Sequence, residues 1–359
     1  MAEGATLHKS SNETIGALLA RNASNYGSNI AMREKERGIW KESTWAEYVE
    51  EILACAAGLE KIGVKPGTAV LILGDNRARL YGGMLAISLL GAYAMPAYPG
   101  ATLEELQHFL GEAEIVAAIA EDQEQVDKIL EIRDAGASGI KHIIYDETRG
   151  LGFYEDDGLM SWDHLIEVGQ HDLNETPSRL HSSGTTGKPK GIVLSQKNVL
   201  TAARNGHDAG AYEKDEDILA YLPMAWVGDY AITVAAALMY RFTVNVPERQ
   251  ETVVRDMREI APTFYLAAPR SWDQMLTTIQ VGMEDSTPLK KWLYHFFMDR
   301  AIAAETRKLN GKSGGMLEPL GRLLGEAIVF GPIKDQFGMS RLKSAFTGGE
   351  AIGEDTFVF

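Results

Sequence analysis

Residues 181–191 read His181-Ser-Ser-Gly-Thr-Thr-Gly-Lys-Pro-Lys-Gly191 and combine four hydroxyl side chains, three glycines and two lysines. Hydroxyl groups and glycine amides can surround a polyphosphate, and lysines can neutralise its charge. The Walker pattern G-x-x-x-x-G-K-[ST] does not fit, because Gly184 and Gly187 are three residues apart and Pro189 follows the first lysine. The stretch therefore predicts a phosphate-binding loop of another kind, with an unliganded polar surface loop as the alternative.

The composition of the chain indicates a globular protein with a large core. Its 359 residues suffice for two domains or subdomains, and 45% hydrophobic content is ordinary for such a protein. The net charge of −15, from 35 Lys and Arg against 50 Asp and Glu, argues against nucleic acid as a partner. The single cysteine, Cys55, excludes an intrachain disulfide and fits a reducing compartment. Residues 1–12 carry no apolar signal core, so we expect a cytoplasmic protein.

One uncharged segment, residues 80–103, is long enough to suggest a membrane span. It contains four glycines and two prolines, however. We therefore expect a buried helix to about Leu90, a turn at Gly91 and a short buried strand that ends before Pro99. Cys55 falls on the apolar stripe of an earlier helix, which indicates packing in a core.

Short apolar runs alternate with amphipathic helices along most of the chain, which predicts parallel sheets covered by helices. Capping boxes at Thr44-x-x-Glu47 and Thr102-x-x-Glu105 each open a helix, and Ser195 can cap a third. The alternation stops in residues 146–180 and resumes after the phosphate loop. We therefore predict an α/β fold of two stacked sheets, with an N-terminal subdomain of residues 1–170 and a second subdomain of residues 171–359. Strands are expected at 68–73, 92–97, 115–119, 142–145, 192–194, 218–222, 242–246 and 264–268, and further helices at about 77–90, 124–135, 227–238 and 252–260.

Residues 286–338 are predicted to be mostly helical, with Pro288 at a first helical position. Two interpretations fit the mixture of basic and aromatic side chains near the start of this segment. It forms a membrane-surface helix for a lipid substrate, or its rings pack inside the protein with the lysines exposed. Peripheral contact with a membrane and a homodimer both stay open. The side chains concerned are Lys290, Lys291, Trp292, Tyr294, His295, Phe296 and Phe297.

Several segments together resemble the adenylate-forming superfamily, which includes acyl-CoA synthetases, firefly luciferase and peptide-synthetase adenylation domains. Residues 182–191 fill nearly every position of its phosphate-loop pattern, [ST]-S-G-[ST]-T-G-x-P-K-G. Tyr221-Leu-Pro-Met-Ala-Trp-Val-Gly228 is similar to the family segment Y-L-P-L-x-H-x, and Thr347-Gly-Gly-Glu-Ala351 is similar to G-G-[AE]-x. Within the superfamily, residues 246–253 and Ala268-Pro-Arg-Ser-Trp272 look most like long-chain fatty acyl-CoA synthetases.

The resemblance implies the fold of the adenylate-forming N-terminal domain and a two-step reaction. A carboxylate attacks the α-phosphate of ATP to give an acyl-adenylate and pyrophosphate, and a thiol, usually that of coenzyme A, then displaces AMP. The implied ligands are ATP, Mg2+, coenzyme A and a fatty acid or other small carboxylic acid. Because a carboxylate is already ionised at pH 7, the first step needs alignment of two anions and stabilisation of phosphate charge rather than a general base.

The resemblance also implies roles for individual residues. Lys190 matches the near-invariant loop lysine, so Lys190, Thr185 and Thr186 form the candidate catalytic set, while Lys188 matches a variable position and is equally well a solvated surface lysine. Glu350 would line the adenine site or serve as a charge at a helix N-terminus. ATP would be held by Ser182, Ser183, Gly184, Thr185, Thr186, Gly187, Lys188, Lys190, Gly191, Gly348, Gly349, Glu350 and Ala351, and the acyl pocket would be bordered by Trp226, Val227, Gly228 and Tyr230.

Three departures from the family pattern bear on these predictions. The approach to the loop, residues 175–181, is too polar for a central strand. Trp226 replaces or displaces the usual histidine of the acyl segment, where it would gate a lipid tunnel or fill core volume. The family's Tyr-Gly-x-Thr-Glu magnesium segment, its catalytic lysine and its mobile C-terminal domain lie beyond Phe359. We therefore assign no metal ligand, and we expect the 359 residues alone to bind without full turnover.

The sequence leaves two alternatives to an ATP-dependent acyl-CoA ligase. One is an adenylation domain that loads a carrier protein, and the other is a non-catalytic module that binds nucleotide or fatty acid. A kinase or phosphohydrolase fits poorly, because the Walker spacing fails and no base motif is visible.

Overall fold

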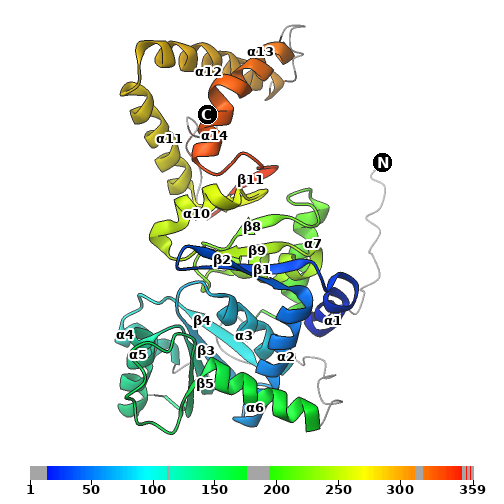
Figure 1. Ribbon diagram of the computed structural model, residues 1–359, viewed down its shortest axis with the longest axis vertical. Helices are drawn as coiled ribbons and strands as arrows, with labels where there is room; N and C mark the ends of the chain where they lie inside the picture. The colour runs from blue at the N-terminus through cyan, green and yellow to red at the C-terminus, as the bar shows by residue number, and fades with distance from the viewer. Residues whose placement is uncertain are drawn as a thin grey trace, which may run out of the picture.

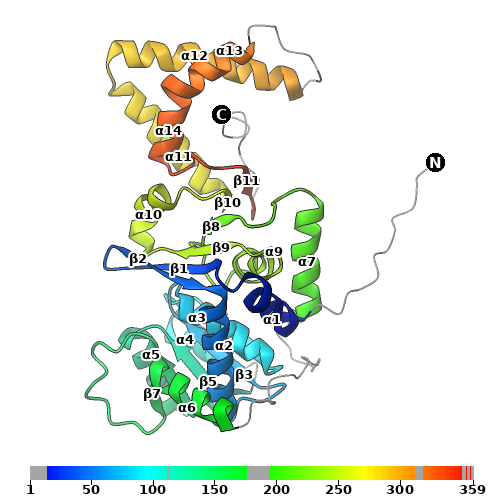
Figure 2. The same ribbon diagram turned by 45° about the vertical axis from the view of Figure 1, so that its right-hand side comes forward.

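The computed structural model describes residues 14–110, 114–136, 138–175, 194–309, 311, 318–349, 353 and 356. Within these residues the strands form two sheets stacked in the body of the protein, and an arm of helices extends beyond the second sheet (Figure 1 and Figure 2). Both sheets are largely parallel and carry helices on their faces. The predicted α/β class is confirmed.

The first sheet is parallel throughout and has the strand order β4-β3-β5-β6-β7. β3 is buried along its whole length, and its side chains alternate between two hydrophobic cores, with Ile72 in one and Leu71 in the other. A strand covered on both faces reads as a continuous apolar run, as seen here. The strands are β3 (Ala69–Leu73), β4 (Tyr93–Ala97), β5 (Ile115–Ala120), β6 (His142–Tyr145) and β7 (Leu159–Ser161).

Helices cover both faces of the first sheet. One core includes residues of α2 (Trp45–Lys61), α3 (Ala78–Leu89) and α6 (Trp162–Glu175). The other includes residues of α4 (Leu103–Leu110) and α5 (Gln123–Asp134).

The predicted boxes at Thr44 and Thr102 do open α2 and α4. Cys55 is fully buried, which confirms its packing role. The uncharged segment of residues 80–103 holds α3, a turn and β4, as expected. Across the described part of the chain, no helix combines the length and the apolar character needed to cross a membrane.

The second sheet has the order β11-β10-β8-β9-β1-β2 and is parallel except at the β1–β2 hairpin. This hairpin, which pairs through β1 with β9, was not predicted from the sequence. The same holds for β7 and α6, which lie within residues 146–180; β7 extends the first sheet and α6 covers it. The hairpin therefore belongs to the second sheet, although its residues lie within the predicted N-terminal subdomain of residues 1–170. The division at residue 170 stays a prediction. The strands are β1 (Ile30–Glu36), β2 (Ile39–Thr44), β8 (Asp217–Leu219), β9 (Thr243–Val246), β10 (Phe264–Ala267) and β11 (Ser344–Thr347).

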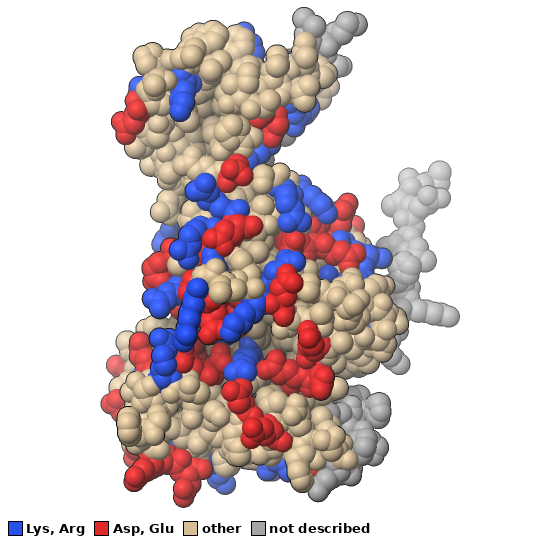
Figure 3. Space-filling view, viewed as in Figure 1, with Lys and Arg blue, Asp and Glu red and all other residues tan. Residues whose placement is uncertain are grey.

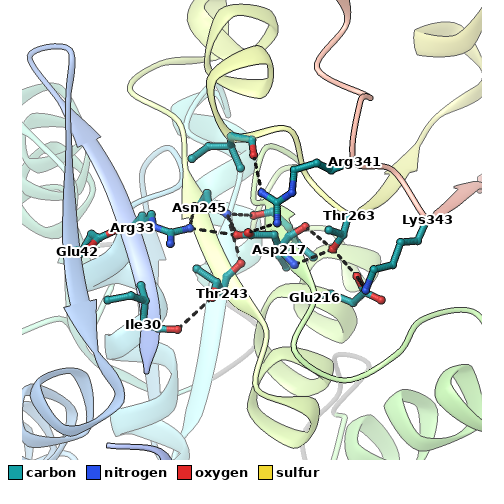
Figure 4. Close-up of polar contacts among 12 residues, drawn as sticks. Ile30, Arg33, Glu42, Glu216, Asp217, Thr243, Asn245, Thr263, Arg341 and Lys343 are labelled. Atoms are coloured by element: carbon teal, nitrogen blue, oxygen red, sulfur yellow. Dashed lines mark hydrogen bonds and ion pairs between the residues drawn. The ribbon is translucent and has the colours of Figure 1, made fainter. Parts of the chain in front are cut away.

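A row of polar side chains crosses the second sheet around Asp217, at the start of β8 (Figure 4). The Asp217 carboxylate accepts hydrogen bonds from Arg33 of β1 and from Asn245 of β9, each at 3.1 Å. It also accepts one at 3.1 Å from Arg341, just before β11. The Asp217 N–H donates to the hydroxyl of Thr263, which precedes β10, at 2.8 Å. The row thus connects the amino ends of the strands whose carboxyl ends carry the candidate site.

The remaining helices pack against the second sheet or form the arm. Ser195 caps α7 (Gln196–Asp208), the first described helix after the phosphate loop, as predicted. Residues 286–338 are mostly helical where they are described, which was also predicted. Those near the sheet are α1 (Ile15–Tyr26), α7 (Gln196–Asp208), α8 (Val227–Asp229), η1 (Tyr230–Ala236), α9 (Ala237–Tyr240), η2 (Gln250–Thr252) and α10 (Val253–Ile260). The arm consists of α11 (Pro269–Glu284), α12 (Pro288–Leu309), α13 (Glu318–Gly325), η3 (Glu326–Phe330) and α14 (Gly331–Gln336).

The arm has a small hydrophobic core of its own. Tyr294 and Phe297 of α12 are buried in it, so the packing interpretation is confirmed for these two rings. Trp292 is 59% exposed, and the arm shows few charged side chains on the face in Figure 3, whereas charges of both signs cover the hairpin β1–β2 below it. Peripheral membrane contact stays a prediction.

A buried ion pair joins the hairpin to α10. Lys35 Nζ lies 2.7 Å from Asp256 Oδ1 and 2.5 Å from Glu259 Oε2, and the Asp256 side chain has no exposed surface. Removing one partner of a buried pair leaves the other charge without compensation, so we expect Lys35→Met to lower the free energy of unfolding by about 3 kcal/mol in urea denaturation. The double variant Lys35→Met/Asp256→Leu should recover part of this loss.

The neighbouring pair of Lys41 with Glu36 provides the control. Both side chains are at least half exposed, at 67% and 50%, so Lys41→Met should change stability little. Equal losses for Lys35→Met and Lys41→Met would show that burial does not set the strength of the first pair.

Candidate functional site

The carboxyl ends of β8, β10 and β11 meet at one edge of the second sheet, because β10 pairs in parallel with both neighbours. In α/β sheets, ligands bind outside this edge. The Tyr221 hydroxyl, just after β8, donates to the Leu266 carbonyl at 2.7 Å. The Gly348 N–H, just after β11, donates to the Ala267 carbonyl at 3.3 Å. The last two residues of β10 thus bring two of the sequence-predicted segments to its two sides.

Residues 221–228, which we call the acyl segment, contain a turn and an aromatic ring that packs against its end. In the turn, the backbone N–H of Trp226 donates to the Pro223 carbonyl at 2.9 Å. The Trp226 ring lies against Gly228, where a Cβ would come within 3.1 Å of a ring atom, so a larger residue would push the indole away. Val227 between them is 56% exposed. The structure therefore brings Trp226 and Gly228 into contact and leaves Val227 facing solvent.

Tyr230, the fourth predicted acyl-pocket residue, is partly buried and packs against the large hydrophobic core. Burial raises the pKa of its phenol, against a hydrogen bond with Ser88 of α3, which lowers it. Ser88 in turn donates to the Met84 carbonyl at 2.8 Å within the same helix. Tyr230 thus contacts the helical layer between the two sheets.

A buried carboxyl group directly after the acyl segment was not predicted from the sequence. Asp229 is 1% exposed and accepts hydrogen bonds from the hydroxyls of Tyr81 and Thr233, each at 2.8 Å. Burial raises the pKa of Asp229 to about 7, although both hydrogen bonds lower it. One signal could have found it, since Asp229 is the only charged residue in residues 221–240.

The helix predicted at residues 227–238 is present, but it is not an α-helix throughout. One turn of α8 leads into the π-helical η1, and α9 follows. Thr233 lies within η1 and reaches back to Asp229. Such π segments occur frequently at functional sites, which agrees with the position of η1 shortly after the end of the acyl segment.

The predicted adenine segment is described only in its first part. Gly349 has φ +99°, a backbone conformation that a residue with a side chain adopts only under strain. Gly348 is partly buried, and a Cβ there would touch Leu266 at 3.8 Å, so this position itself has room for a small side chain. Glu350 and Ala351 lie outside the described residues.

The phosphate loop also lies outside the described residues. The roles of Ser182 to Gly191, with Lys190 foremost, therefore stay predictions. The described residues continue from Leu194, which is not part of a strand, and the rest of the strand predicted at 192–194 lies outside them. The Ser195 hydroxyl accepts a hydrogen bond from the Asn198 N–H at 3.1 Å to open α7. In the described residues, no group of three or more His, Cys, Asp or Glu side chains is arranged to hold a metal ion.

Two helix-covered, largely parallel sheets, with the acyl and adenine segments at one carboxyl edge, define an α/β protein of the adenylate-forming kind. A family model for AMP-binding enzymes matches residues 19–359, and the chain belongs to this family. The resemblance inferred from the motifs is confirmed.

Relatives by sequence include two long-chain-fatty-acid–CoA ligases. ACSBG2 of Rattus norvegicus is 25% identical over 369 residues, covering 96% of this chain and 54% of the relative. ACSBG1 of Homo sapiens is 22% identical over 366 residues, covering 96% of this chain and 49% of the relative. The chain thus spans about half the length of the curated relatives it matches.

Solved structures share the fold at low sequence identity. The A-PCP didomain of a carboxylic acid reductase from Segniliparus rugosus, in complex with AMP, has a TM-score of 0.68 at 16% identity and covers 97% of this chain and 51% of that chain. The long-chain-fatty-acid-CoA ligase FadD1 from Archaeoglobus fulgidus has a TM-score of 0.63 at 16% identity and covers 77% and 55%.

Proposed function

We propose that this chain is the ATP- and fatty-acid-binding portion of an ATP-dependent acyl-CoA ligase. The observation that carries the proposal is the position of residues 221–228 and 348–349 on the two sides of β10. A fatty acid held by the first segment and a nucleotide held by the second would have their reacting groups brought together, as the first step requires. Membership of the AMP-binding family supports the nucleotide, and the names of the relatives support a long-chain fatty acid and coenzyme A.

In this proposal the residues of the chain bind and orient the reactants, and no residue acts as a general base. The acyl segment holds the hydrocarbon chain beside Trp226, and the backbone after β11 receives the adenine. The hydroxyls of Thr185 and Thr186 donate to phosphate oxygens, and Lys190 neutralises charge on the leaving pyrophosphate. Mg2+, when bound with ATP, would neutralise part of the phosphate charge, and we assign no residue of this chain to hold it.

Isotope exchange between pyrophosphate and ATP tests the first step. We expect the full-length gene product to catalyse exchange that depends on a long-chain fatty acid and on Mg2+, and that stops when EDTA is added. A fatty alcohol of the same length is the matched control, since it lacks the attacking carboxylate. Exchange that is equally fast with the alcohol, or absent with every acid, would refute the proposed reaction.

The same assay on the 359 residues alone addresses the alternative that they bind nucleotide or fatty acid and catalyse nothing. Acid-dependent exchange by this shorter chain would contradict that alternative. Supplying coenzyme A and a carrier protein to the full-length product then identifies the acceptor. Thioester found only on the carrier would replace the ligase with a carrier-loading adenylation domain.

A further inference from the structure

A side chain from the first sheet holds the beginning of the acyl segment. Asn76 follows β3, at the carboxyl edge of that sheet, and is 4% exposed. Its Nδ2 donates to the Ala220 carbonyl at 2.7 Å and to the Leu222 carbonyl at 2.8 Å. These carbonyls flank Tyr221, where the chain leaves β8. Both amide hydrogens are used, so the Asn76 side chain fixes the direction in which the acyl segment starts.

A second side chain from the same stretch holds the other end of the segment. Tyr81 of α3 is 1% exposed, and its hydroxyl donates to Asp229 Oδ2 at 2.8 Å. Asp229 comes directly after Gly228, the last residue of the acyl segment. The segment is therefore bonded at its start and just beyond its end to residues that are only five positions apart in the sequence.

The stretch that carries Asn76 is itself firmly anchored. The carboxylate of Glu121, after β5, accepts a hydrogen bond from the Asp75 N–H at 2.6 Å and pairs with Arg77 at 2.7 Å. Arg77 also donates to the Glu248 carbonyl, after β9, at 3.1 Å. A Cβ at position 74 would come within 2.4 Å of the Glu121 Cβ, so Gly74 is needed for this close approach. The first sheet thus offers a fixed support to the second.

We propose that Asn76 and Tyr81 are positioning residues that hold the acyl segment in the geometry that binds the fatty acid. The proposal rests on the function proposed above. Neither residue belongs to the segment, and neither is among the residues to which ATP binding is assigned above. Their loss should therefore weaken use of the fatty acid far more than use of ATP.

Amide hydrogen exchange on the 359-residue chain tests the support without any assumption about activity. Asn76→Asp removes both donated hydrogen bonds and places a carboxylate against two carbonyl oxygens, and Tyr81→Phe removes only the hydroxyl. We expect exchange in peptides covering residues 221–228 to become at least about tenfold faster in either variant. Unchanged exchange in both variants would overturn the proposal.

Asn22 supplies a matched control, because it is another buried asparagine that donates to a backbone carbonyl. Its Nδ2 lies 2.9 Å from the Leu238 oxygen, and it has no exposed surface. Asn22→Ala should lower the melting temperature without accelerating exchange in residues 221–228. Equal acceleration by Asn22→Ala would mean that the effect is a general loss of stability, which would also overturn the proposal.

Steady-state kinetics of the full-length gene product test the link to the substrate. We expect Asn76→Asp and Tyr81→Phe to raise KM for the fatty acid about tenfold and to change KM for ATP less than about twofold. Faster exchange with both KM values unchanged, or with both raised equally, would reduce the two residues to structural ones. A wild-type protein without acid-dependent activity would refute the proposed function instead, and the exchange result would still stand.

Discussion

Lys190→Ala is expected to lower fatty-acid-dependent adenylation by about 100-fold in the full-length gene product, the typical cost of removing one group that stabilises charge in a transition state. Lys190 matches the near-invariant lysine of the phosphate loop, and the departing pyrophosphate needs a nearby cation in an otherwise acidic protein of net charge −15. Loop lysines contribute little to folding, so the unfolding transition should not move. The measurement pairs isotope exchange between pyrophosphate and ATP with a thermal melt.

Lys188→Ala is the matched control for this prediction, because the two lysines are separated only by Pro189. Lys188 matches a variable family position, so its loss should affect adenylation much less than the loss of Lys190. The reverse order would show that the wrong lysine was chosen. A large drop in melting temperature for Lys190→Ala, with activity retained, would make Lys190 a structural residue.

All strands of the first sheet except β7 could be predicted, because their burial is visible locally. In β3 every residue is apolar, since both faces of the strand are covered, and the turn at Gly91 separates α3 from β4. The helix starts at Thr44 and Thr102 were predicted for a similar reason, because a capping box is complete within four residues. Ser195 was predicted as a cap from its residue type, and the structure adds the box with Asn198.

The β1–β2 hairpin could not be predicted because its polar side chains are satisfied by residues far away in the sequence. Arg33 bonds to Asp217 and Lys35 to Asp256, so two charged residues of β1 are paired inside the fold rather than exposed. Local patterns treat such a run as a solvated loop. The sequence of the hairpin itself does not indicate these partners.

The candidate site divides in the same way. The acyl and adenine segments were predicted from the residues they contain, and the structure adds that both flank the end of β10. Asn76 was not found, because its partners are the backbone carbonyls of Ala220 and Leu222, which carry no sequence signal. Asp229 could have been noticed as a lone charge in an apolar helix, but its hydrogen bonds with Tyr81 and Thr233 are visible only in the structure.

Asp229→Asn is expected to gain stability relative to the wild-type protein as pH rises from 5 to 8. Burial raises the pKa of Asp229 from 3.8 to about 7, so the folded chain keeps a proton that the unfolded chain releases. The contribution of Asp229 to the stability of the wild-type protein therefore falls as pH rises from about 4 to about 7, by about 4 kcal/mol. Asparagine cannot ionise and removes this loss. Between pH 5 and pH 8, the advantage of the variant should grow by roughly 2 to 3 kcal/mol in chemical denaturation.

Asp256→Asn provides the control, because the pKa of Asp256 is shifted in the opposite direction to that of Asp229. Burial opposes ionisation of Asp256, but hydrogen bonds from Lys35 and Thr252 outweigh it and hold the pKa below its ordinary value. Its contribution to stability is complete above that ordinary value and is lost only as pH falls further, so Asp256→Asn should be destabilised equally at pH 5 and pH 8. Glu34, whose pKa burial also raises to about 7, is present in both variants, and its effect cancels. If the difference in unfolding free energy between Asp229→Asn and wild type is the same at both pH values, Asp229 is ionised in the folded protein at both. Tyr81 and Thr233 then donate to a charged carboxylate rather than to a neutral acid.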